Sequence, residues 1–300
     1  PESQTDLRQR RTHALPPNSN YDRKTDNPRQ PPPRASPQST PNCHGRKTKS
    51  QYLITNLRQT QVKTNLPTSK LKTLATKIRD KNLRKKVSEL LENPTFEIDG
   101  KTYKALPLET APAGLSHHHN YPGGYIEHVT STTNIALALC DSAEKIYHGK
   151  ANRDLVIAGV LLHDIFKTTM YAKNENGSFS STPLAEYLDH LSLATAELVR
   201  RNFPLELVHI VTAHHGQYGP IRPRTLEALI CHLADFTDSR LNGEVLNAAQ
   251  YLARKATGQE MYGLTSSEAF EIVHSKSIEG WKGLVKKVNK IKQKRRTHKT

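Results

Sequence analysis

The 300-residue sequence predicts an all-α fold with one or two small β-hairpins. Apolar residues recur at helical spacing from Leu71 to Leu91 and again in later segments. Two helix-start signals support this reading, because Thr182-Pro183 pairs a cap with a first-turn proline and Thr265–Glu268 has the capping-box pattern. Patterns typical of strands are few and short. We therefore expect a bundle of helices.

The first half of the ordered region contains both predicted hairpins. Asp99-Gly100 and Asn176-Gly177 are two-residue turn signals between short alternating segments. In chain order, we expect a helical stripe over 71–91, a hairpin at 96–103, a long helix after Pro122-Gly123-Gly124 that carries His128 toward Tyr147, a helix over 152–162, and a hairpin at 171–179.

The second half is predicted to be entirely helical. We expect a helix that starts at Thr182-Pro183 and carries His190, a helix after Pro204 that ends in His214-His215-Gly216, a helix over 225–241 with Asp235 toward its end, and C-terminal helices from residue 265. The segment from Lys282 to Lys299 is rich in lysine and arginine, and we expect it to fray into a basic tail.

The positive charge of the chain lies at its two ends. The formal net charge is +16, of which residues 1–69 carry +8 and residues 282–300 carry +9, whereas residues 70–281 carry −1. We therefore divide the chain into a leader (1–69), a nearly neutral domain (70–281) and a basic C-terminal helix or tail (282–300). Basic ends can contact nucleic acid non-specifically, but they say little about what enters the domain.

The leader has the composition of a disordered segment. Residues 1–69 hold 10 of the 18 prolines and are rich in Gln, Asn, Ser, Thr and Arg, so they bury too little apolar area to offset the entropy of ordering. The sequence begins at Pro1, and its only methionines are Met170 and Met261. We hypothesise that the leader is partly a misassigned start, with translation beginning at a non-Met codon nearer Leu71.

Cysteine use and hydropathy indicate the cytoplasm. Cys43, Cys140 and Cys231 form neither a paired framework nor a CxxC motif, which favours a reducing compartment. No apolar run approaches the roughly 20 residues that a membrane helix needs, and the N-terminus lacks the apolar core of a secretion signal. We therefore expect a cytoplasmic protein without a membrane partner.

A histidine-aspartate pair, His163-Asp164, closes the apolar stretch 156–162. The dipeptide alone is weak evidence, because chance supplies about half of one in a chain with this many His and Asp residues. Further candidate ligands flank it on both sides: His128, His190, His214, His215 and Asp235. Imidazoles and carboxylates on successive helices can converge on divalent metals, and a metal lets water attack phosphorus at neutral pH. The pattern predicts a metal-dependent phosphohydrolase.

Asp164 is the predicted bridge between two metal ions. Adjacent helical residues point about 100° apart, so Asp164 can face two ions while His163 serves one. We assign His128, His163, Asp164 and Asp235 to the first ion, and Asp164, His190, His214 and His215 to the second. Such ligands favour Fe(II), Mn(II), Co(II) or Zn(II) over Mg(II). Taken singly, each histidine is more often a surface or core residue, and a single ion stays an alternative.

Several residues near these ligands can contact the substrate. Lys167, one turn after Asp164, can offset charge on the attacked phosphate, although a solvated lysine fits the spacing equally well. We expect 117–119 to form a loop over the cleft in which His118 and His119 meet phosphate. Tyr121 can offer a flat surface to a heterocycle, and Arg222 can bind phosphate. The alternatives are that Tyr121 only packs and that Arg222 caps the next helix.

Four strings carry a resemblance to a known family: HHHNYPGGYIEHV (117–129), LLHDIFK (161–167), TAHHG (212–216) and CHLADFTD (231–238). With the order His128, His163-Asp164 and Asp235, they resemble the HD-domain superfamily of phosphohydrolases over about residues 70–280. They look like the branch that holds bacterial HD-type 3′→5′ exoribonucleases. With the lead-in FEIDGKTYKALPLETAPAGLSHHH (96–119), they resemble more closely the archaeal 7,8-dihydroneopterin 2′,3′-cyclic phosphate phosphodiesterases.

The resemblance implies an HD-domain helical bundle that holds the ligand sets above, with iron as the favoured metal. It implies catalytic roles for Asp164 and Lys167, in which activated hydroxide opens a cyclic phosphate to a monoester in tetrahydromethanopterin-type biosynthesis. Asp238, one turn beyond Asp235, would hold a metal ligand in its orientation without binding the metal itself. Phe166 stands where glycine is common in the family, and this departure affects the turn that presents Lys167.

Two other functions stay open. An exoribonuclease or other nucleotide phosphohydrolase would use the basic ends to hold RNA, although residues 1–69 lack the alternating strands of an OB fold. A non-catalytic nucleotide sensor would keep the fold and lose turnover. The expected partner is a small phosphorylated substrate, and a homo-oligomer also stays open.

Overall fold

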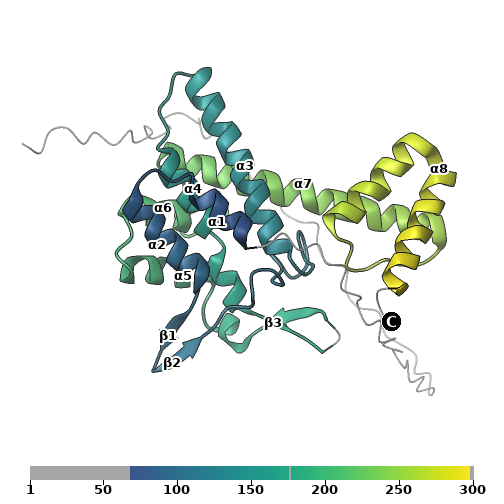
Figure 1. Cartoon of the computed structure of the whole chain (residues 1–300), viewed down its shortest axis with the longest axis horizontal. Helices are drawn as coiled ribbons and strands as arrows, with labels where there is room; N and C mark the ends of the chain where they lie inside the picture. Colours follow the sequence, from purple (N-terminus) through teal and green to yellow (C-terminus); the bar gives the residue numbers. More distant parts are fainter. Residues whose placement is uncertain (1–67, 176, 298–300) are drawn as a thin grey trace, which may run out of the picture.

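The computed structural model describes residues 68–175 and 177–297, which form helices and two small hairpins (Figure 1). The α-helices are α1 (Ser69–Ala75), α2 (Lys81–Glu92), α3 (Gly124–Lys145), α4 (Arg153–Leu162), α5 (His190–Arg200), α6 (Leu205–Ala213), α7 (Leu226–Thr257) and α8 (Ser266–Thr297). Short 3-10 helices lie at Ile165–Thr169, Pro183–Glu186 and Gly216–Tyr218. The prediction of an all-α fold is confirmed.

Both predicted hairpins are present in the described chain. Strand β1 (Phe96–Ile98) pairs antiparallel with β2 (Lys101–Tyr103), and β3 (Tyr171–Lys173) pairs antiparallel with β4 (Phe179–Ser181). The predicted disorder of residues 1–69 lies outside the described residues except at 68 and 69. Asn176 of the second turn also lies outside them.

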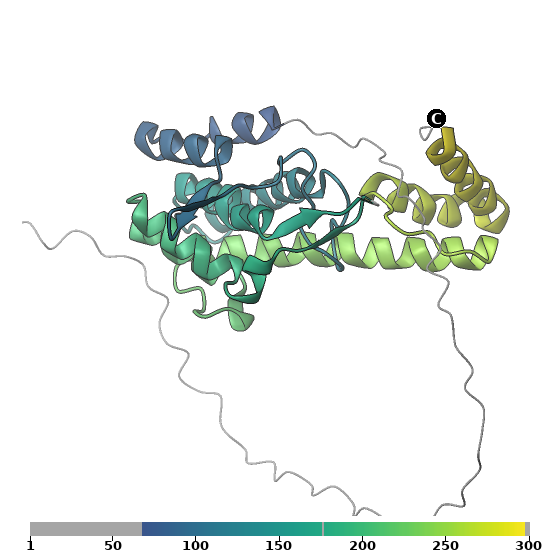
Figure 2. The same cartoon turned by 90° about the horizontal axis from the view of Figure 1, so that it is seen from below.

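The helices form layers around a main apolar core, and smaller apolar clusters lie beside it. Helices α3 and α4 lie between α1 and α2 on one side and α7 on the other, with α6 packed against α4 and α7 (Figure 2). The core is filled by fully buried aliphatic and aromatic side chains, among them Leu71, Leu90, Ile126, Leu161 and Phe166. Burial of such side chains is the main force that brings helices together. The layers thereby fix α3, α4 and α7 relative to one another.

The helix expected from Thr182 divides into two elements. Pro183–Glu186 forms a short 3-10 helix, and α5 begins separately at His190. Asp189 precedes α5 in extended conformation, and its side chain accepts a hydrogen bond from the backbone N–H of Ser192 at 2.6 Å. This N-cap competes with continuation of the earlier turn. The prediction of one helix was wrong, and His190 consequently lies at a helix start.

Helix α7 continues well past its expected end at Leu241 and stops before Gly258. Its C-terminal half packs against α8 through buried side chains, including Leu246, Ala249 and Ala253. A single glycine inside a helix costs only about 1 kcal/mol, and this packing outweighs that cost at Gly243. Asp235 therefore lies inside a long helix.

Helix α8 turns back on its own first half at Gly280 (Figure 1), where φ is 67° and few residues other than glycine are tolerated. Its second half contributes Leu284, Val288 and Ile291 to the apolar cluster that α7 and the first half of α8 also form. The expectation that Lys282 to Lys299 frays was wrong as far as Thr297. Lysines occupy the positions between these apolar residues and obscure their helical spacing.

The start of α8 has the predicted capping box. The backbone N–H of Glu268 donates to Thr265 Oγ1 at 3.3 Å, and the backbone N–H of Thr265 donates to Glu268 Oε2 at 3.1 Å. Arg295, near the other end of α8, donates from Nε to Glu268 Oε1 at 2.9 Å. The two ends of the kinked helix therefore hold each other in place.

No helix in the described ranges combines the length and apolar character needed to cross a membrane.

We expect Leu284→Ala to lower the free energy of unfolding by about 2–5 kcal/mol, because it leaves a cavity in the α7–α8 packing. Chemical denaturation measures this loss. Lys290→Ala, on the exposed side of the same helix, is the control and should change it by less than about 0.5 kcal/mol. Equal effects of the two substitutions would contradict the packed arrangement of α8.

Candidate metal centre

All seven predicted metal ligands come together inside the bundle. They are contributed by five helices or their ends: His128 on α3, His163 and Asp164 at the end of α4, His190 at the start of α5, His214 and His215 after α6, and Asp235 on α7. The layers of the fold thus bring residues from distant parts of the sequence to one point.

The end of α4 determines how the His163-Asp164 pair is presented. His163 still has helical backbone angles, whereas Asp164 has φ −112° and ψ 7° and starts the 3-10 helix Ile165–Thr169. Both side chains are completely buried. The ends of the two side chains still lie close, with His163 Nε2 3.5 Å from Asp164 Oδ2. The turn therefore places imidazole and carboxylate side by side.

Hydrogen bonds determine which ring nitrogen of each histidine faces the centre. Nδ1 of His163 donates to the carbonyl oxygen of Val160, and Nδ1 of His214 donates to that of Val211, both at 2.7 Å. Nδ1 of His128 lies 2.7 Å from Asp238 Oδ2. Because each Nδ1 holds a proton for an acceptor, each Nε2 can present a lone pair to a metal.

The first set of ligand atoms surrounds His128 Nε2. That nitrogen lies 3.1 Å from His163 Nε2, 3.6 Å from Asp164 Oδ2 and 3.3 Å from Asp235 Oδ1. Ligand atoms that share one ion at about 2.1 Å are separated by about 3.0–3.4 Å. These spacings fit a single divalent ion bound by two imidazoles and two carboxylates.

The second set surrounds the other oxygen of Asp164. Asp164 Oδ1 lies 3.4 Å from His190 Nε2 and 3.4 Å from His214 Nε2. The rings of His214 and His215 are 4.3 Å apart, and all four residues offer ligand atoms within 4.8 Å of one another. The two oxygens of Asp164 therefore face the two sets separately, as a bridging carboxylate would.

The unsatisfied atoms support a cation at each set. Within the described chain, Asp164 Oδ1, His190 Nε2 and His214 Nε2 are buried without a hydrogen-bond partner. Such atoms are costly unless something binds them. In the first set, the lone pairs of His128 Nε2 and His163 Nε2 face each other at 3.1 Å, which a cation between them would relieve. The donor set thus fits two divalent ions of the kind that bind imidazole and carboxylate.

The pKa shifts show that the centre favours positive charge. Burial opposes the ionised form of Asp164, but Lys167 and neighbouring histidines outweigh it and hold the pKa of Asp164 well below its usual range. Burial also opposes a charged His128, yet carboxylates that include Asp164 and Asp235 raise the pKa of His128 well above its usual range. Burial and then Lys167 lower the pKa of His190 to about 2, so its ring stays neutral. The carboxylates around His128 thus favour a positive charge at that point, and the neutral ring of His190 keeps a lone pair for a metal.

Comparison with known proteins agrees with this geometry. The HD domain profile matches residues 125–240. A dihydroneopterin 2′,3′-cyclic phosphate phosphodiesterase of Methanocaldococcus jannaschii is 41% identical over 227 residues, which are 73% of this chain and 91% of that protein. The chain belongs to the HD domain family of phosphohydrolases. No solved structure matches it.

Other HD domain relatives match a smaller part. The 3′-5′ exoribonuclease YhaM of Bacillus subtilis is 33% identical over 144 residues, which are 44% of this chain and 43% of that protein. The protein of the same name from Oceanobacillus iheyensis is 31% identical over 182 residues, 53% of this chain and 55% of that protein. The matched region thus covers about half of this chain and about half of each exoribonuclease.

Lys167 lies beside Asp164, the carboxylate that faces both ligand sets. Its Nζ donates to Asp164 Oδ2 at 2.7 Å, and its side chain is mostly buried. Burial acts to lower the pKa of Lys167, but Asp164 and Asp235 outweigh burial and raise it. Lys167 therefore carries a positive charge next to the metal ligands. Phe166, the departure from the family pattern, points into the apolar core and is fully buried.

The histidine loop, residues 117–119, lies against the first ligand set. The ring of His118 is 5.1 Å from that of His128, and the ring of His119 is 5.3 Å from it. His119 is buried, with Nε2 3.7 Å from Asp238 Oδ2. Burial and then His128 lower the pKa of His118 to about 4, so this ring is neutral near pH 7. Both histidines are thus near the centre, as expected of groups that meet phosphate.

The other two substrate candidates lie elsewhere. Tyr121 is 1% exposed in the α7–α8 apolar cluster, and its hydroxyl contacts Ser266 and Glu127. Its ring faces are covered, so the expectation that they stack on a heterocycle was wrong. Arg222 is exposed in the segment before α7, and no described ion pair joins it to the centre.

Sequence reasoning missed two residues that hold the histidine loop. The backbone N–H of His119 donates to Asn242 Oδ1 at 2.8 Å. A Cβ atom on Gly124 would lie 2.1 Å from the carbonyl oxygen of His119, so only glycine fits there. The Gly123-Gly124 pair was a signal for Gly124. Asn242 gave no signal because it was expected to lie beyond the end of its helix.

We expect Gly124→Ala to displace the histidine loop, because the added methyl group overlaps backbone that cannot rotate away. The free energy of unfolding should fall by about 1–3 kcal/mol, measured by chemical denaturation. Ala136→Gly, further along α3, should cost about 1 kcal/mol from helix propensity and lost packing. A Gly124→Ala protein of wild-type stability would show that the loop does not approach α3 this closely.

We expect Asp238→Asn to weaken metal binding about 10- to 100-fold, because the carboxylate that orients His128 through Nδ1 is lost. Competition with a chelator measures the affinity. Glu244→Gln, exposed on α7 and paired with Arg240, is the matched control and should bind metal like the wild type. Unchanged affinity of Asp238→Asn would show that this contact does not support the metal.

Proposed function

We propose that this protein is a metal-dependent phosphodiesterase that opens a cyclic phosphate ester, with 7,8-dihydroneopterin 2′,3′-cyclic phosphate as its substrate. The observation that carries the proposal is the 41% identity with the Methanocaldococcus jannaschii enzyme of that name, which extends over 91% of that enzyme. The assembled ligand sets of the HD domain supply the chemistry that this reaction needs. Two free, buried cysteines, Cys140 and Cys231, support a cytoplasmic, reducing location.

We assign two metal ions to the two ligand sets that share Asp164, with Fe(II) favoured and Mn(II), Co(II) or Zn(II) as alternatives. Bound metal would lower the pKa of water from about 15.7 toward about 7 and polarise the phosphoryl oxygens. His128, His163 and Asp235 would hold one ion, and His190, His214 and His215 the other. Imidazole-rich sets disfavour Mg(II), which prefers oxygen ligands.

The residues around the ligand sets would position the phosphate. Lys167, charged and 2.7 Å from Asp164, would offset negative charge that gathers on the phosphoryl oxygens. His118 and His119 would donate hydrogen bonds from neutral rings at the edge of the first set. Asp238 would keep the Nε2 lone pair of His128 directed inward. The leaving alkoxide would take its proton from solvent.

The exoribonuclease function is the second candidate, and the matches to YhaM proteins favour it. Those matches cover only about half of each enzyme, and residues 70–281 carry a net charge of −1, which gives an RNA chain little attraction. Release of mononucleotides from single-stranded RNA, falling steeply with salt, would support this candidate instead.

We expect the full-length protein, purified without oxygen and loaded with Fe(II) or Mn(II), to convert 7,8-dihydroneopterin 2′,3′-cyclic phosphate to a monoester. Chromatography of the products measures turnover. A chelator should abolish it, and Asp164→Asn should reduce it more than about 100-fold, since both ions lose a charged ligand. Asp141→Asn, on the surface of α3, is the control. Metal-loaded protein that leaves the cyclic phosphate intact would refute the proposal.

A further inference from the structure

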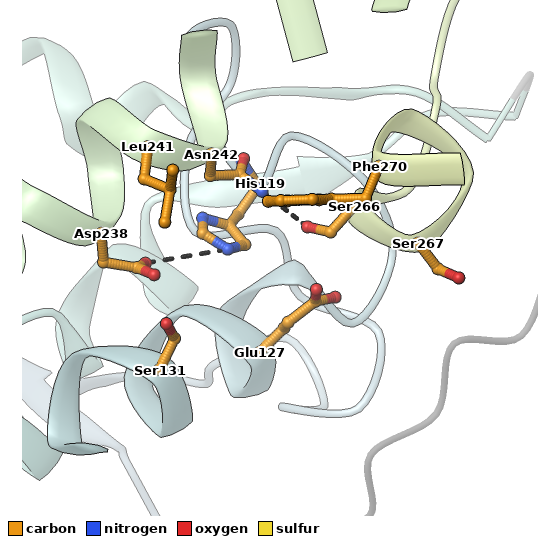
Figure 3. A pocket seen from close by; sticks show the side chains of 9 residues that line it. All are labelled: His119, Glu127, Ser131, Asp238, Leu241, Asn242, Ser266, Ser267 and Phe270. Atoms are coloured by element: carbon orange, nitrogen blue, oxygen red, sulfur yellow. Dashed lines mark hydrogen bonds and ion pairs between the residues drawn. The ribbon is translucent and has the colours of Figure 1, made fainter. Parts of the chain in front are cut away.

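A pocket of about 320 Å³ opens beside the first ligand set (Figure 3). Helix α3 supplies Glu127 and Ser131 on one side, and α7 supplies Asp238 and Leu241 on another. The first turns of α8 close it with Phe270 and two serines. The volume lies in the range of small-molecule sites, which is about 300–1,000 Å³.

The pocket adjoins the candidate metal centre. His119 lines it, and its ring is 5.3 Å from the ring of His128. Asp238 also lines it and contacts His128 Nδ1 at 2.7 Å. A single imidazole, that of His119, therefore separates the pocket from the first ligand set. A ligand in the pocket with a short side chain could reach the ions past this ring.

The charges of the pocket select the kind of group that it can hold. Glu127 and Asp238 place two carboxylates on its wall, and no lysine or arginine is among the described residues that line it. Such a wall repels phosphate and attracts N–H donors. Glu127 Oε2 accepts a hydrogen bond from the Tyr121 hydroxyl at 3.1 Å, whereas Oε1 has no hydrogen bond within the described chain. Glu127 thus keeps acceptor capacity directed into the pocket (Figure 3).

Two apolar side chains, those of Phe270 and Leu241, form one side of the pocket. Phe270 is 46% exposed and Leu241 is 51% exposed, although both lie at the pocket. Phe270 extends over the space between His119 and Glu127 (Figure 3). Exposed aromatic rings beside a few polar groups are typical of sites that stack a planar ligand. The combination suits an uncharged heterocycle rich in N–H groups.

The far wall of the pocket is built by the part of the chain beyond the HD domain match, which ends at residue 240. Asn242 joins the walls, because it accepts from the His119 backbone and donates from Nδ2 to Ser266 Oγ at 2.6 Å. The return of α8 onto its own start, through Arg295 and Glu268, holds this wall in place. The C-terminal helices thereby form one wall of the pocket beside the candidate metal centre.

We propose that this pocket binds the heterocyclic ring of the substrate, with Glu127 as the specificity-determining residue and Phe270 as the stacking surface. The inference rests on the proposed function and extends it. The ring of a dihydropterin presents an amino group beside a ring N–H, and this pair of donors matches the two oxygens of a carboxylate. Its side chain is short enough for the cyclic phosphate to reach the ligand sets while the ring stays in the pocket.

The test compares two cyclic phosphates, one with the pterin ring and one without any ring. Substrates are 7,8-dihydroneopterin 2′,3′-cyclic phosphate and glycerol 1,2-cyclic phosphate. For Glu127→Gln and for Phe270→Ala we expect kcat/KM on the pterin substrate to fall at least about tenfold. The first variant replaces a carboxylate acceptor with an amide, and the second removes the aromatic ring on which the pterin would stack. On glycerol cyclic phosphate, which has no ring, the loss should be at least about tenfold smaller, so the ratio of the two kcat/KM values reports the loss of ring binding.

Matched controls lie on α8 outside the pocket. Glu271→Gln and Trp281→Ala change an exposed carboxylate and an exposed ring on α8 and should leave both activities unchanged. Equal loss of both activities in Glu127→Gln would overturn the inference, since it would mean disturbance of the adjacent His128. Unchanged kcat/KM on the pterin substrate in both pocket variants would overturn it too.

Binding of neopterin, a phosphate-free and fluorescent form of the ring, separates this inference from the proposed function. Saturable quenching with the wild type, weakened at least about tenfold in Glu127→Gln, supports the pocket even if neither cyclic phosphate is hydrolysed. Absence of saturable binding to the wild type overturns the pocket, and turnover of dihydroneopterin cyclic phosphate would still stand by itself.

Discussion

The Asp164 carboxylate is the group on which the arrangement of the centre depends. It is completely buried, and each of its oxygens faces a different set of histidines. Burying an unpaired carboxylate is prohibitively costly, so the structure surrounds it with positive or polarisable groups. Lys167 supplies one charge, and the remaining ligand atoms leave space for cations. The end of α4, the start of α5 and the end of α6 all bring polar groups to this carboxylate.

The apolar layers and the polar centre support each other. Helices α3, α4 and α7 are held by aliphatic contacts, which are not directional. The hydrogen bonds of His128, His163 and His214 give direction to the centre by fixing which ring nitrogen faces inward. The C-terminal helices then add a second, more apolar wall beside the ligand sets.

The convergence of the candidate ligands was predictable from the sequence, because His163-Asp164 and the later His and Asp residues punctuate helical, apolar patterns. The paths of the C-terminal helices were not. Lysines hide the stripe of Leu284, Val288 and Ile291, and Gly243 resembles a stop signal although tertiary packing carries α7 past it. The burial of Tyr121 was missed for the same reason. Its ring is covered by α7 and α8, whereas the sequence patterns indicated that the first of these helices ends at Leu241 and that the chain frays from Lys282 onward. Local patterns specify ligand chemistry, whereas long-range packing decides which neighbouring side chains are free to meet a substrate.

Metal stoichiometry in protein purified without oxygen tests whether Asp164 joins two sites. We expect two Fe(II) or Mn(II) ions per chain in the wild type, measured by elemental analysis after removal of free metal, and at most one in Asp164→Asn. The magnetic coupling of a bridged pair should be visible in the wild type and absent from the variant. A wild-type protein with one ion, or an Asp164→Asn protein that keeps two, would contradict a bridging role for this carboxylate.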